Sequence, residues 1–376
     1  MKDLDLFVLE FLNSQRIHIE NCQQDNRQEK RIKRSFNDIL KAVIKKNDCI
    51  SPPKLIICNS VNKYSYIIPL KNKQEFNYYL LYDKHLNKIN QHLNALFLFN
   101  GDIGHDLWKF SYELFVEESL IINDDLLVAY FGLNNVALGP YDIDTIRNNR
   151  KNQFMCYIQE LYILAHEFGH WLFALSQHKN KKERINLTVN LNDFSDEVLT
   201  TLKNIYKNFS FSVYDNDYIA FVHDQTNIIN SNTGIVEECV ADAIAIAYVF
   251  TILSKKYPNN QSKKLQCAQS LLLAMMNLQI LAINHMTLSQ IGFENETAIR
   301  FHHFRDYLEL YFENDIESFN NMIEKTVIHY EDAIANPIME CFSVLEKRKE
   351  HIKNTLTNDG VTKFENIFGF RDVTYE

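Results

Sequence analysis

Glycine and proline are scarce in this sequence, with 9 Gly and 6 Pro among 376 residues. Their scarcity argues against long flexible linkers and against a sandwich of many short strands, and it favours helices. Long apolar runs are missing as well. The most membrane-like stretch, 271–283, has roughly 13 residues against the ~20 that span a bilayer, and Asn277 and Gln279 interrupt it. We therefore predict a buried helix there and no membrane partner.

An excess of positive charge is also absent, because 39 Lys and Arg stand against 48 Asp and Glu, a formal net charge of −9. Phosphate binding requires clustered positive charge, so this balance argues against a nucleic-acid partner. Two basic runs, 30–34 and 179–184, are typical of solvated helix faces or loops.

The seven cysteines include no C-x-x-C pair. An odd, dispersed set is typical of a reduced protein that uses cysteine as a small buried apolar side chain. The first residues include Asp3 and Asp5, where a secretory signal would be basic and then continuously apolar. We therefore predict a cytoplasmic location. The cysteines are Cys22, Cys49, Cys58, Cys156, Cys239, Cys267 and Cys341.

The spacing of apolar residues changes near residue 140 and predicts an α+β fold with two lobes. Residues 1–140 form an N-terminal lobe with a small sheet, and residues 141–376 form a mainly α-helical catalytic lobe. The first lobe also has helical spacing before residue 50 and over 106–118, and Asp83 is placed to cap a helix.

Short β-branched and aromatic runs predict the strands. Those at 55–58, 64–70 and 78–82 are expected to form the small sheet, the first two as a hairpin across 59–63. Two further runs, at 126–132 and 136–139, also have an extended character. Helices are predicted at 154–177, 193–207, 235–256, 262–284, 296–313 and 315–349, the last broken near Pro337.

The sequence His166-Glu167-Phe168-Gly169-His170 lies within the first predicted helix of the second lobe. Residues four apart share a helix face, so His166 and His170 can direct their imidazoles at one Zn²⁺ ion. Glu167 lies one step further round the helix, where it can reach a zinc-bound water as a general base. Gly169 allows a neighbouring backbone to approach closely.

A catalytic zinc requires a third protein ligand, and the helical segment 237–245 carries the candidates. Here the chain resembles the gluzincin metallopeptidases, whose second helix supplies a glutamate ligand followed four residues later by an aspartate. The resemblance implies that Glu238 completes the zinc site. It also implies that Asp242 accepts a hydrogen bond from a zinc histidine, His166, and fixes its tautomer.

Other ligands remain open at this stage. Glu237 is the rival carboxylate, although it has Ala241 four residues later instead of an acid. Cys239 has suitable chemistry but is expected to be a packed apolar residue. A third histidine of metzincin type is excluded, because Ser176 stands six residues after His170. A salt bridge without metal would also explain two carboxylates on an apolar helix.

Peptide hydrolysis also requires a group that stabilises the oxyanion. The candidates are His223, Arg300, His302 and His303, with Arg300 and His223 taken as the predicted catalytic pair. Intracellular gluzincin-like families carry His-Pro shortly before an arginine, and this chain lacks that pair. Each candidate could equally be a structural or solvent-facing basic residue.

The predicted activity is that of a zinc-dependent endopeptidase acting on an intracellular protein or peptide. The resemblance to gluzincins covers 155–245, and the general features are similar to phage-exclusion and repressor-cleaving peptidases. The gluzincin resemblance implies that the substrate backbone pairs with an edge strand near the active site. The candidate for that edge strand is 126–132, which includes Val128 and Tyr130. Two alternatives remain: a zinc hydrolase of a non-peptide amide, and a non-enzymatic helical interaction or regulatory protein. The oligomeric state is not predicted.

Overall fold

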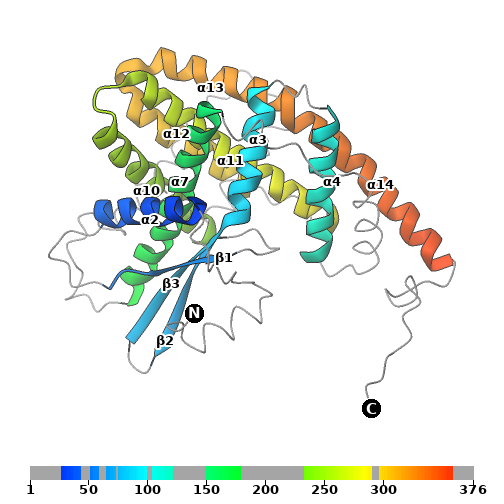
Figure 1. Cartoon of the computed structure of the whole chain (residues 1–376), viewed down its shortest axis with the longest axis horizontal. Helices are drawn as coiled ribbons and strands as arrows, with labels where there is room; N and C mark the ends of the chain where they lie inside the picture. The colour runs from blue at the N-terminus through cyan, green and yellow to red at the C-terminus, as the bar shows by residue number, and fades with distance from the viewer. Residues whose placement is uncertain are drawn as a thin grey trace.

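A computed structural model describes the chain in eight segments. It is mainly helical, with one small three-stranded sheet, in agreement with the coarse α+β prediction. The sheet lies at one end of the molecule, and the helices make up the rest (Figure 1). The described residues are 27–43, 51–58, 65–72, 75–99, 104–121, 149–178, 233–289 and 296–358.

The sheet consists of β1 (Lys54–Cys58), β2 (Tyr66–Asn72) and β3 (Glu75–Asp83), in the order β1-β3-β2. β1 pairs with β3 in parallel, and β2 pairs with β3 in antiparallel register. The predicted hairpin between the first two strands is therefore wrong. The hairpin is formed by β2 and β3. β3 is central because it pairs with both other strands, and its residues 78–83 are all buried.

β3 leads directly into α3 (Lys84–Leu98). The Asp83 side chain accepts a hydrogen bond from the backbone N–H of His85 at 2.8 Å, so its predicted role as an N-cap is confirmed. The next helix, α4 (Gly104–Ile121), includes the stretch predicted to be helical.

The other predicted helices within the described residues are present. The break near Pro337 is confirmed: the π-helical segment η2 (Glu331–Ala335) precedes it, and Asn336 N–H bonds to the carbonyl of Glu331. The wider turn relieves the clash that a proline causes inside an α-helix. The helices are α7 (Arg150–His178), α10 (Thr233–Lys256), α11 (Gln261–Ser289), α12 (Glu296–Glu309), the 3₁₀ segment η1 (Leu310–Asp315), α13 (Ile316–Tyr330) and α14 (Asn336–Asn358).

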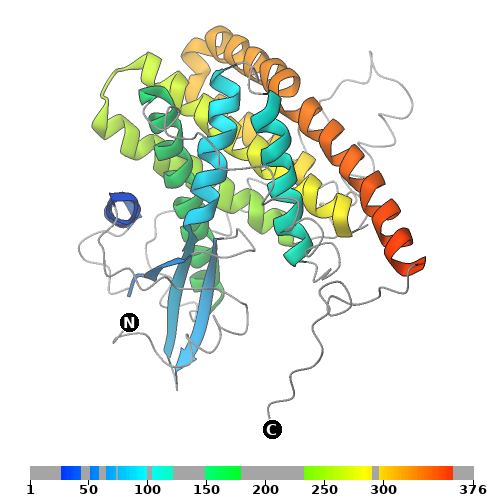
Figure 2. The ribbon, with the colours of Figure 1, turned by 45° about the vertical axis from the view of Figure 1, so that its right-hand side comes forward.

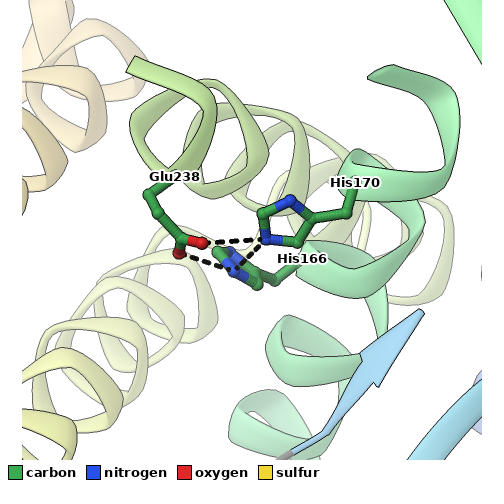
Figure 3. A group of neighbouring side chains, drawn as sticks. All are labelled: His166, His170 and Glu238. Atoms are coloured by element: carbon green, nitrogen blue, oxygen red, sulfur yellow. Dashed lines mark hydrogen bonds and ion pairs between the residues drawn. The ribbon is translucent and has the colours of Figure 1, made fainter. Parts of the chain in front are cut away.

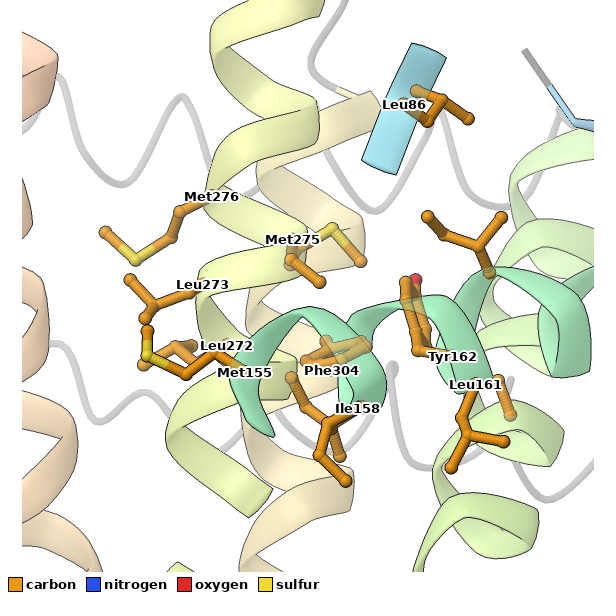
Figure 4. Close-up of a cluster of buried hydrophobic side chains, with 14 of the residues drawn as sticks. Leu86, Met155, Ile158, Leu161, Tyr162, Leu272, Leu273, Met275, Met276 and Phe304 are labelled. Carbon is orange, nitrogen blue, oxygen red and sulfur yellow. The ribbon is translucent and has the colours of Figure 1, made fainter. Parts of the chain in front are cut away.

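α7 is the central helix, in contact with α10, α3, α11, α2 (Arg27–Val43) and the strands β2 and β3. Its apolar side chains interlock with those of α11 and α12, as Figure 4 shows. α11 has the length and apolar composition of a membrane span, but most of its apolar window is buried inside the protein, as in a core helix. The side chains labelled in the figure are Leu86, Met155, Ile158, Leu161, Tyr162, Leu272, Leu273, Met275, Met276 and Phe304.

A buried carboxylate fastens α7 to the N-terminal helices. Glu160 accepts hydrogen bonds from Arg31 Nε at 3.0 Å and Ser35 Oγ at 2.7 Å on α2, and from Asn87 Nδ2 at 2.9 Å on α3. Arg31 belongs to the first basic run, so that run is only partly the solvated face expected of it. Figure 2 shows α2 end-on, separate from the layer of helices that contains α11 and α14.

Several predictions fall outside the described residues: the extended runs 126–132 and 136–139, the helix 193–207 and the basic run 179–184. The lobe boundary near residue 140 is among them, so the division into 1–140 and 141–376 stays a prediction. The five described cysteines are all buried with free thiols, as expected: Cys58, Cys156, Cys239, Cys267 and Cys341.

Candidate metal centre

The site lies beside a close contact between α7 and α10. Gly169 faces Ala241, and a Cβ at position 169 would lie only 2.7 Å from the Cα of Ala241. The close approach expected of Gly169 is therefore confirmed. Gly169 precedes His170, and Ala241 lies one helical turn after Glu238. Because Gly169 has no side chain, the two helices can approach closely here. Residues far apart in the sequence thus come to the same point.

His166, His170 and Glu238 direct their ligand atoms at one another, the histidines from α7 and the glutamate from α10 (Figure 3). One ligand atom from each lies within 4.8 Å of the others, so this group could hold a metal ion. The two Nε2 atoms are 3.1 Å apart, and each lies 3.3 Å from an oxygen of Glu238.

These separations fit a tetrahedral metal. Ligands at 2.0–2.1 Å from zinc are separated by about 3.3 Å along each edge of the tetrahedron. The separation of the two Nε2 atoms, 3.1 Å, is close to that edge, and each is 3.3 Å from a different oxygen of Glu238, His166 from Oε2 and His170 from Oε1. Two imidazoles and one carboxylate are also the donor types that bind zinc in catalytic sites. Burial alone would lower the pKa of His166, but Asp242 and Glu238 raise it above its usual value, and metal binding requires the neutral form of the imidazole.

Asp242 is fully buried and surrounded by donors. Its Oδ1 lies 2.8 Å from Nδ1 of His166 and accepts a hydrogen bond from the Tyr162 hydroxyl at 2.6 Å. The contact between Asp242 and Nδ1 is an ion-pair contact and does not have the geometry of a hydrogen bond. The negative charge of Asp242 still favours a proton on Nδ1, which leaves Nε2 as the nitrogen that can bind a metal. Asp242 therefore stands where a residue that orients a metal histidine is expected.

Arg300, on α12, reaches both carboxylates. Its Nε and Nη2 donate to Oδ2 and Oδ1 of Asp242 at 3.0 Å each, and its Nη1 lies 2.9 Å from Oε2 of Glu238. Burial alone would raise the pKa of Asp242, but the charges of Arg300 and His166 lower it to about 2. Both effects also act on Glu238, whose pKa is held well below its usual range by His166, His170 and Arg300 despite burial. Both carboxylates are therefore anionic.

Glu167 is buried beside the two histidines, with 6% of its surface exposed. Burial raises the pKa of its carboxyl to about 7, against the opposing charges of His166 and His170. A carboxyl with a pKa near neutrality can both accept and return a proton. A divalent cation in the site would favour its ionised form, as a general base requires.

The remaining candidates have different surroundings. Cys239 is fully buried in the core, as expected of an apolar packing residue, and His303 is also buried, at 1% exposure. Burial lowers the pKa of His303 to about 4, so its imidazole is neutral at physiological pH. His302 is half-buried on the same helix. His223 and the Glu237 side chain lie outside the described part of the chain.

Tyr162 is a site residue that the sequence did not single out. Its hydroxyl binds Asp242, and its ring lies 6.0 Å from that of His166. One signal was available, because Tyr162 precedes His166 by four residues and so shares its helix face. The sequence contained no corresponding indication that Arg300 contacts Asp242, because Arg300 lies 58 residues from Asp242 in sequence.

Comparisons of this chain with protein-family models, with curated proteins and with solved structures give no match. The function is therefore argued from the chemistry of the site.

Proposed function

We propose that the protein is a zinc-dependent endopeptidase that cleaves an intracellular protein or peptide, with Glu167 as the general base. The observation that carries this proposal is the convergence of His166, His170 and Glu238, with a buried carboxyl of raised pKa beside them. When bound there, zinc supplies a nucleophile at neutral pH by lowering the pKa of water, and it polarises a carbonyl.

The chain's own residues would divide the remaining work. His166 and His170 would hold the metal with their Nε2 atoms, and Glu238 would contribute a carboxylate oxygen. Asp242 keeps the proton of His166 on Nδ1. Glu167 takes a proton from the attacking water and returns it to the leaving amine.

The activity test is a panel of unfolded proteins, peptides and acylated small amines, incubated with zinc-loaded protein in ¹⁸O-labelled water. Mass spectrometry detects new peptide carboxyl ends that carry the label. We expect labelled peptide ends with the wild type and a loss of about 10²–10⁴-fold with Glu167→Gln, which keeps the shape of the side chain but not its basicity. Label only in the small acids would favour the non-peptide amidase, and no hydrolysis of any substrate the non-enzymatic alternative.

A further inference from the structure

One guanidinium spans the two carboxylates of the site. The Arg300 side chain is 15% exposed and uses all three nitrogens: Nε and Nη2 on Asp242, Nη1 on Glu238. The guanidinium is planar and rigid, so a fork of this kind fixes the orientation of what it binds as well as its charge. Asp242 and Glu238 are thereby held in one position relative to each other.

The two oxygens of Glu238 have different neighbours. Each oxygen lies 3.3 Å from Nε2 of one histidine, Oε2 from His166 and Oε1 from His170, but Oε2 alone is also 2.9 Å from Nη1 of Arg300. A charge-assisted hydrogen bond holds the rotamer of the carboxylate and draws electron density from the oxygen that accepts it. Oε1 is left as the better donor to a cation.

Denticity matters at a catalytic metal, which must keep a coordination position open for water or substrate. A glutamate that binds through both oxygens would compete for that position. With His166 and His170 already facing the site, a glutamate that binds through one oxygen gives three protein ligands and leaves the fourth position free.

We propose that Arg300 is a positioning residue of the metal site: it holds Oε2 of Glu238, so that the metal is bound through Oε1 alone, and it holds Asp242 against His166. Its role rests on the proposed function, because it requires a metal in the site. It differs from the oxyanion-binding role that the sequence suggested, because the guanidinium acts through the carboxylates and not on the substrate.

The test is the visible absorption spectrum of the full chain after chelator treatment and loading with Co²⁺, whose band intensity reports coordination number. We expect the intense bands of four-coordinate Co²⁺ in the wild type. Arg300→Gln frees both oxygens of Glu238, so its bands should weaken and shift as the coordination number rises. Arg300→Lys keeps the charge but cannot bridge two carboxylates, and it should fall between the two.

Arg305→Gln is the matched control, because Arg305 lies on the same helix, is more exposed, and pairs with Asp306 instead of the site. It should give the wild-type spectrum. A wild-type spectrum in Arg300→Gln would overturn the proposed role. If Arg300→Gln fails to fold by circular dichroism, Arg300→Lys decides: weakened bands support the role and unchanged bands overturn it. A wild-type protein that takes up neither Co²⁺ nor zinc would instead refute the proposed function itself.

Discussion

Gly169→Ala tests whether the crossing of α7 and α10 sets the geometry of the metal site. The new Cβ would lie 2.7 Å from Ala241 Cα, 3.0 Å from its Cβ and 3.3 Å from its carbonyl oxygen. Carbon atoms prefer a separation of about 3.5–4.0 Å, so the helices must move apart by about 1 Å. The nearest atom belongs to backbone, which cannot turn aside as the end of a side chain can.

Two opposing effects determine the change in stability. Overpacking costs about 1–3 kcal/mol, whereas alanine is favoured over glycine in a helix by about 1 kcal/mol. The expected net loss is therefore about 0–2 kcal/mol in the free energy of unfolding, measured by urea titration with a chelator present. The displacement of the helices by about 1 Å also exceeds the roughly 0.5 Å tolerance of a functional site. Zinc affinity should therefore fall at least about tenfold.

Zinc affinity is measured by competition with a chromophoric chelator. The double variant Gly169→Ala/Ala241→Gly is the control, because it removes the contact with the Ala241 Cβ but not the one with its Cα. We expect it to recover part of the zinc affinity but not the stability, because a glycine at 241 in helix α10 itself costs about 1 kcal/mol. Stability at or above that of the wild type, with unchanged zinc affinity, would show that the crossing does not constrain the site.

Three further changes have definite expected outcomes. Asp242→Asn removes a buried anion from an ion pair, so urea titration should show a loss of about 3–5 kcal/mol, and zinc affinity should fall about 10–100-fold; retention of both would contradict the orienting role. Glu160→Gln weakens the contact with Arg31 that fastens α2 to α7, and stability should fall by about 1–3 kcal/mol with zinc affinity unchanged. Because burial lowers the pKa of His303 to about 4, below its unfolded value of about 6.5, the unfolded chain binds the proton first. Up to about 3 kcal/mol of stability is then lost as pH falls from about 6.5 to about 4, a slope that His303→Gln should lack.

Helical spacing predicted the parts of the site that lie on single helices. His166 and His170 are one helical turn apart, and so are Glu238 and Asp242. Each pair therefore lies on one face of its helix. The contact between the pairs depends on the crossing of α7 and α10. In the sequence, only Gly169 indicated a close approach by another backbone. Nothing in the sequence identified Ala241 as the residue that approaches it.

Tertiary pairing accounts for what the sequence did not reveal. Glu160 meets Arg31 across 129 residues, and nothing in the spacing of either helix selects the other. The predicted pairing of the first two strands was wrong for the same reason. Short apolar runs show that strands form, but they do not show which strand pairs with which, and β3 pairs with both of the others.

Zinc content of the purified protein tests the central claim most directly, measured by mass spectrometry in the wild type, Glu238→Ala and Glu167→Gln. The site predicts close to one zinc per chain in the wild type and in Glu167→Gln, which changes the base but not a ligand, and a clear loss in Glu238→Ala. Zinc content that is unchanged in Glu238→Ala would contradict the proposed ligand set. No zinc in the wild type, even after reconstitution, would contradict the proposal that the protein is a metallopeptidase.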